Sequence, residues 1–156
     1  MTATVLGLTQ RRKDAKVATV FSLASVESTK LTENELAKVV VDVAYRIHRT
    51  YGPGLFESVY HAVMVHELRR RGLQVKSKHS VPLIWEGVQL DAFEADIIVE
   101  DKLVLELKSV EEVARVHKKQ LLTYLRLTNC RLGLLINFGS EFIKDGISRV
   151  VNGLED

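Results

Sequence analysis

The stretch covering residues 94–109 constrains the fold of this chain more than any other. It contains two short apolar runs, residues 97–99 and 103–105, separated by the polar pair at 100–101. Two such runs around a polar turn are typical of a tight antiparallel β-hairpin. A regular, purely structural strand with one wet face would alternate apolar and polar residues. Here the polar groups instead gather at the open end of the hairpin.

Three charged side chains form this polar end. Glu106 and Lys108 are two residues apart, so on a strand they leave the same face, and antiparallel pairing brings Asp96 beside them. Two neighbouring carboxylates favour a cation between them, and Mg²⁺ takes oxygen ligands, to which the carbonyl of Leu107 could add. A salt bridge at the end of a strand is the structural alternative, and the hairpin alone does not distinguish the two.

The length and the charge of the chain limit its class. At 156 residues, 46% hydrophobic and 27% charged, the sequence is that of a one-domain protein with a sizeable core and no membrane span. Residues 1–30 carry a net charge of +3 and lack a sustained period, so we expect a poorly ordered extension, a plain tail or a transit peptide. Residues 31–156, the expected domain, carry −1. The lone Cys130 fits a reducing, cytoplasmic setting.

Periodicity along the domain predicts helices flanking a mixed β-sheet. A capping box at Thr32 begins a helix that ends before Gly52, and helical spacing recurs further along the chain. A strand–helix–strand crossover from Lys108 to Phe138 predicts one parallel pair of strands. We expect the other helices over residues 55–71 and 113–127, and strands over 74–78, 81–85, 88–92, 97–99, 103–108, 131–138 and 141–150.

Two of the predicted helices carry polar and aromatic groups on one face. Glu57, Tyr60 and His61 share a face of the second helix, and His117, Gln120 and Tyr124 share a face of the third. Each set suits either a site or a solvated face. An acid in a first helical turn also favours the helix dipole, and a tyrosine or a histidine can belong to the core.

The order of these motifs resembles a known nuclease signature. Asp96, then Glu106-Leu107-Lys108, then a helix with Gln120 and Tyr124, is similar to the active-site pattern of the PD-(D/E)XK nuclease superfamily. More narrowly, the stretch 54–60, Gly-Leu-Phe-Glu-Ser-Val-Tyr, resembles the signature of its GxxExxY protein family. The resemblance covers about residues 33–140. Ala95 stands where the superfamily's name has proline.

This resemblance implies a restriction-endonuclease-like fold of mixed α/β (α+β) class, with a central four-stranded mixed β-sheet flanked by α-helices. It implies metal ligation by Asp96 and Glu106, with the Leu107 carbonyl and Glu57 completing the site. Lys108 would be the catalytic lysine. The expected supporting or substrate-contacting residues are Tyr60, His117, Gln120 and Tyr124.

The function expected from the sequence is Mg²⁺- or Mn²⁺-dependent hydrolysis of DNA or RNA. The near-neutral charge of the domain leaves a second hypothesis open, a catalytically inactive nucleic-acid-binding or assembly module on the same fold. A scaffold that forms a homodimer through an edge strand is a third.

Overall fold

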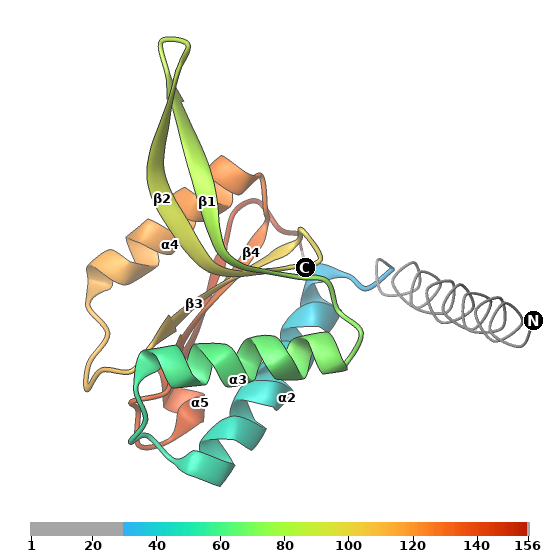
Figure 1. The fold of residues 1–156 in the computed structure, drawn as a ribbon, viewed down its shortest axis with the longest axis vertical. Helices are drawn as coiled ribbons and strands as arrows, with labels where there is room; N and C mark the ends of the chain where they lie inside the picture. Colours follow the sequence, from blue (N-terminus) through green and yellow to red (C-terminus); the bar gives the residue numbers. More distant parts are fainter. Residues whose placement is uncertain (1–29, 156) are drawn as a thin grey trace, which may run out of the picture. The chain divides into compact units, whose positions relative to one another are not determined.

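The computed structural model of the chain describes residues 30–155, so the expected N-terminal extension lies outside the described residues except for Lys30. The described elements follow the order of two helices, a three-strand meander, a helix, a strand, a short helix and a last strand (Figure 1). Their bounds are α2 (Glu33–Tyr51), α3 (Glu57–Arg70), β1 (Val75–Trp85), β2 (Val88–Val99), β3 (Leu103–Lys108), α4 (Arg115–Thr128), β4 (Leu132–Asn137), α5 (Ile143–Gly146) and β5 (Ile147–Val151).

The described strands form one mixed sheet in the order β1-β2-β3-β4-β5. All neighbours are antiparallel except β3 and β4, whose parallel pairing runs from Leu103–Leu132 to Lys108–Asn137. The expected crossover through α4 and the mixed α+β class are therefore confirmed. The sheet has five strands in the part of the chain that the structure describes, rather than four, because residues 147–151 add an antiparallel edge strand.

Helices cover both faces of this sheet, each over its own hydrophobic cluster. One cluster joins α2 and α3 to side chains such as Ile97, Leu105 and Ile136, and the other joins α4 to Ile98 and Val104. Figure 1 shows α2 and α3 on one side of β3 and α4 on the other. β3 and β4 are therefore buried on both faces, as expected for strands that read as continuous apolar runs.

The helix starts and the buried stripes follow the sequence closely, with one exception. Thr32 and Glu35 form the predicted capping box, and helical spacing predicts a buried stripe of six residues on α2, of which all but Val39 are buried. On α4 the same spacing predicts that Val116, Leu121 and Leu125 face inward; the two leucines are buried, whereas Val116 is half exposed. The prediction for Val116 was wrong because it lies in the first turn of α4, before the stripe formed by the two leucines meets the sheet.

Two groups of expected strands differ from the structure. The runs 74–78 and 81–85 are one long strand, β1, and 88–92 continues into 97–99 as β2. The region 141–150 holds the short helix α5 before β5 begins. Much of β1 and β2 projects as a hairpin beyond the helices (Figure 1), so its two faces lack the difference in burial from which strand length is inferred.

The expected tight hairpin is present, and it opens directly at the candidate site. Only three pairs join β2 to β3, from Val99–Leu103 to Ile97–Leu105. β2 also turns over at this point, because Ile97 packs on the α3 side and Ala95, two residues away, packs on the α4 side. In a regular strand both would face the same side. The two strands therefore separate at Asp96.

Candidate active site

Asp96 and Glu106 lie at the point where β2 leaves β3, and both are largely buried, each with 9% of its surface exposed. The Oδ2 atom of Asp96 accepts a 2.8 Å hydrogen bond from the backbone N–H of Leu107. This bond replaces a ladder bond that β2 no longer supplies. It also holds the Asp96 carboxylate beside the end of β3, where the sequence placed it.

The Glu106 carboxyl is kept from ionising freely. Its pKa is raised to about 7, mainly by burial and also by the negative charges of Asp96 and, less strongly, Glu57, while the Lys108 ammonium acts in the opposite direction. Its Oε2 atom is buried and has no hydrogen-bond partner among the described residues. A buried acceptor without a partner costs free energy unless a proton or a cation occupies it.

Lys108 lies on the same face of β3 as Glu106. Its Nζ atom is 3.7 Å from Oε1 of Glu106, a distance that makes the contact an ion pair rather than a hydrogen bond. Both side chains are mostly buried. One lysine therefore stands against the buried carboxylates, and the expectation that these three side chains lie together agrees with their positions.

Asp96 also lines a cavity of about 350 Å³, whose lining does not include Glu106 or Lys108. Glu57, the first residue of α3, forms part of its wall, and Leu107 forms another part. His61 is also in the wall, where its Nε2 atom lies 3.0 Å from the Asp96 carbonyl oxygen and 3.3 Å from Ser77 Oγ. The remaining lining residues are Ser58 and Lys78.

The loop before Glu57 is held from two directions at Leu55. The Leu55 N–H donates to the hydroxyl of Tyr60 at 3.1 Å, and the Leu55 carbonyl accepts a 2.8 Å bond from the hydroxyl of Ser109. Tyr60 also donates to the Gly52 carbonyl. Its hydroxyl is therefore engaged by the loop before Glu57. The contact of Ser109 was not predicted, because a lone serine after a strand carries no signal of it.

Tyr60 is also part of the core. Its ring is fully buried and stacks on Phe138, with centroids 4.3 Å apart and planes inclined by 6°. This stacking holds the ring in the core, while the hydroxyl holds the loop before α3. One side chain thereby links the end of β4 to the start of α3.

The three residues expected from α4 lie in different environments. Burial raises the pKa of the Tyr124 hydroxyl, and the carboxylates of Glu106 and Asp96 add to the effect, while the Tyr124 ring packs edge-on against Phe93. His117 is partly buried, and its Nδ1 atom has no hydrogen-bond partner among the described residues. Gln120 is exposed, one turn before Tyr124. Within residues 30–155, no hydrogen bond connects the side chain of His117 or Gln120 to the carboxylates.

The donor set fits a divalent cation only in part. Asp96 and Glu106 offer carboxylate oxygens, and the unpartnered Oε2 of Glu106 is the kind of acceptor that a hard cation satisfies. No group of three His, Cys, Asp or Glu side chains within the described residues is arranged to hold a metal ion. Glu57 therefore stands at a distance from the pair, and water or substrate oxygens would have to complete the coordination of Mg²⁺.

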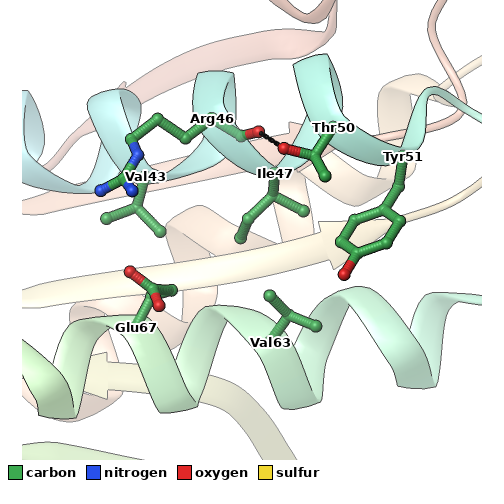
Figure 2. A pocket seen from close by; sticks show the side chains of 7 residues that line it. All are labelled: Val43, Arg46, Ile47, Thr50, Tyr51, Val63 and Glu67. Atoms are coloured by element: carbon green, nitrogen blue, oxygen red, sulfur yellow. Dashed lines mark hydrogen bonds between the residues drawn. The ribbon is translucent and has the colours of Figure 1, made fainter.

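A second cavity, of about 190 Å³, lies between α2 and α3 (Figure 2). It contains none of the predicted site residues. Arg46 reaches toward Glu67 in this view, but Glu67 is already paired with Arg70 at 3.0 Å, and Thr50 donates back to the Arg46 carbonyl. The cavity is a gap between two packed helices.

A model of a known protein family, described as the PD-(D/E)XK nuclease superfamily, matches residues 34–150. The matched range includes every predicted site residue and the whole crossover from β3 to β4. No significant match to a curated protein or to a solved structure was found. None of the helices in residues 30–155 is long and apolar enough to cross a membrane.

Proposed function

This chain belongs to the PD-(D/E)XK nuclease superfamily, and from that premise we propose that it hydrolyses phosphodiester bonds of DNA or RNA with Mg²⁺ or Mn²⁺ as its cofactor. The observation that carries the proposal is the pair of buried carboxylates, Asp96 and Glu106, with Lys108 3.7 Å from the second. A structural ion pair would need one acid for one lysine. The second acid gives the site a use for a divalent cation.

Each residue then has a defined role. Asp96 and Glu106 would hold the cation, with the Leu107 carbonyl as a further oxygen ligand. Such a cation, when bound, polarises the phosphate and lowers the pKa of the attacking water. Lys108 would orient that water and neutralise a phosphate oxygen in the transition state. Glu57, across the cavity from Asp96, would hold a water of the metal's outer shell.

Within the superfamily we assign the chain to the GxxExxY group. The contacts of Gly54-Leu55-Phe56-Glu57-Ser58-Val59-Tyr60 support this assignment, because Tyr60 holds the backbone of Leu55 and the helix that starts at Glu57 follows directly. The group's signature thereby corresponds to one structural unit. Its acid faces the cavity and its tyrosine keeps the acid in place.

The setting of the protein is part of the same proposal. Cys130 is a buried free thiol on the core side of the loop after α4, in keeping with a reducing, cytoplasmic compartment. A homodimer could form through the exposed edge of β1, where Ile84 and Trp85 are about two-thirds exposed. Light scattering on the purified protein measures the oligomeric state directly.

The decisive experiment is a cleavage assay on single-stranded, duplex and branched DNA and RNA, with Mg²⁺, Mn²⁺ or a chelator. We expect metal-dependent cleavage that falls by at least a hundredfold in Asp96→Asn and in Lys108→Ala. Asp101→Asn and Lys119→Ala are the matched controls, because both residues are exposed and lie outside the site. Equal cleavage by Asp96→Asn and the wild type would contradict the proposal.

A catalytically inactive nucleic-acid-binding module is the second candidate. The absence of a preformed three-ligand metal cluster among the described residues favours it. Calorimetric titration with Mg²⁺ separates the two functions. The nuclease requires a Mg²⁺-binding isotherm that disappears in Glu106→Gln, whereas a binding module would retain nucleic-acid affinity without any such isotherm.

A further inference from the structure

Lys78 occupies an irregular position in β1, directly opposite Asp96. The ladder pairs Ser77 with Ile97 and His79 with Ala95, but Lys78 and Asp96 between them do not pair. Lys78 also has a φ of +51°, in the left-handed region. A lysine gains nothing locally from this conformation, which costs on the order of 1 kcal/mol relative to an extended strand.

This backbone conformation changes the direction of the Lys78 side chain. Lys78 belongs to the lining of the 350 Å³ cavity, together with Glu57 and Asp96. Among the described residues its ammonium makes no ion pair within 4 Å, although two carboxylates line the same cavity. Among residues 30–155, no ion pair of the Lys78 ammonium therefore offsets the cost of this conformation.

Two carboxylates, those of Glu57 and Asp96, line the cavity together with one lysine, so the negative charges outnumber the positive one. The Lys78 ammonium lines the same cavity as these acids but pairs with neither. It is therefore suited to bind an anionic ligand that arrives together with a metal cation, because the cation would neutralise the acids. A nucleic-acid backbone is such an anion, since its phosphates repeat along the strand and one of them would sit at the metal. The first turn of α3, which has no side-chain cap, lines the same cavity through Glu57 and Ser58.

We propose that Lys78 binds a backbone phosphate next to the scissile one, in the cavity that Glu57 and Asp96 line and Lys108 does not. This inference rests on the proposed nuclease function and adds a substrate-binding residue to it. Lys108 then serves the reacting phosphate, and Lys78 fixes the register of the strand in the cavity. Contacts to phosphates position a nucleic acid without reading its sequence.

Lys76 provides a matched control on the same strand. It lies two residues before Lys78, is half exposed, and its Nζ atom is 2.6 Å from Asp101. It is absent from the lining of the cavity. Removing either lysine changes the net charge of the protein equally, so a difference between the two variants reports position rather than overall charge.

The test measures binding of a fluorescein-labelled oligonucleotide by anisotropy, with Ca²⁺ replacing Mg²⁺ so that the substrate stays intact. The oligonucleotide is the one that the wild type cleaves best. We expect Lys78→Gln to weaken binding about tenfold and to reduce the slope of log K against log salt by about one. Lys76→Gln should stay within about twofold of the wild type, and Lys78→Arg should restore most of the affinity.

A second variant separates binding from folding. Lys78→Gly removes the ammonium and also relieves the left-handed strain, so its Tm should equal or exceed that of the wild type while binding falls as in Lys78→Gln. If the wild type binds and cleaves and Lys78→Gln matches it in affinity and salt slope, Lys78 has no such role and the nuclease function stands. If the wild type neither binds nor cleaves any nucleic acid, the proposed function fails, and the role of Lys78 fails with it.

Discussion

Ser109 donates a 2.8 Å hydrogen bond to the carbonyl oxygen of Leu55, which joins the end of β3 to the loop before α3. Ser109 directly follows Lys108, and Leu55 lies two residues before Glu57. The two parts of the candidate site are far apart in the sequence, and this bond connects them through the side chain of Ser109 and the backbone of Leu55. The position of Glu57 relative to the β3 residues therefore depends on it.

Ser109→Ala should lower activity more than it lowers stability. Loss of one partly buried hydrogen bond costs about 1 kcal/mol of unfolding free energy. The resulting shift of Glu57 should reduce kcat on the order of tenfold, since small displacements of positioned groups are costly. Urea denaturation and single-turnover cleavage measure the two effects. Ser80→Ala, on the exposed part of β1, is the control, and unchanged kcat in Ser109→Ala would refute the positioning role.

Tyr60→Phe keeps the ring on Phe138 but removes the hydroxyl that holds Leu55 and Gly52. The Leu55 N–H then has no partner from this side chain, and we expect a loss of about 1–3 kcal/mol in unfolding free energy. Tyr45→Phe, at a half-exposed position on α2, should change it by less than about 0.5 kcal/mol. Equal denaturation midpoints for Tyr60→Phe and wild type would show that the loop does not need the hydroxyl.

The raised pKa of Glu106 makes the metal-free protein less stable as pH rises. Its pKa is about 7 in the folded protein against an ordinary value of 4.5, so the folded state binds the extra proton between these pH values. Stability contributed by this group is present below pH 4.5, declines up to about pH 7 and is constant above it. The decline should be on the order of 3 kcal/mol at most.

Chemical denaturation in the presence of a chelator, repeated along this pH range, measures the decline. Glu106→Gln carries a neutral group at every pH and should flatten the curve. Adding Mg²⁺ should restore stability mainly above pH 7, because the ionised carboxylate binds the cation. A variant curve with the same slope as that of the wild type would assign the effect to other groups.

Two glycines should respond oppositely to alanine. A Cβ atom at Gly139 would collide with the backbone of Val110, including its N atom at 2.7 Å, so Gly139→Ala should cost about 2–3 kcal/mol or more. A Cβ atom at Gly54 would meet nothing within 4 Å, and Gly54 does not need a positive φ. Gly54→Ala should therefore be neutral or stabilising by up to about 1 kcal/mol in thermal unfolding. A large loss of Tm in Gly54→Ala would contradict this reading.

The sequence predicted those features that depend on local patterns. The Thr32 capping box, the turn at Glu100-Asp101 and the shared face of Glu106 and Lys108 all follow from spacing over a few residues. The extent of β1 and β2 could not be predicted, because the part of this hairpin around Trp85 is exposed on both faces and leaves no periodic signal. For the capping box, the turn and the shared strand face, the local pattern agrees with the tertiary environment. For the length of β1 and β2, the local pattern carries no information about it.

The candidate site shows the same division. The proximity of the charged residues was predictable from hairpin pairing, and helical spacing placed Tyr60 and His61 on the face of α3 that carries Glu57. The bond from Ser109 and the particular hydrogen-bond partners of Tyr60 and His61 were not predictable. Their contacts join residues 16 to 54 positions apart or reach backbone atoms in a loop. Such contacts depend on how α3 packs on the sheet, and neither residue type nor spacing predicts them.

The bond from the Leu107 N–H to Asp96 has a consequence for how this protein could lose its activity and keep its shape. Asp96 satisfies the buried N–H of Leu107, which has no partner on the diverging strand β2. A substitution that removes this acceptor would therefore destabilise the fold. A descendant released from catalysis would retain an acceptor such as asparagine or serine here. An oxygen acceptor kept at this position would then indicate a structural requirement, and only a kept negative charge would indicate catalysis.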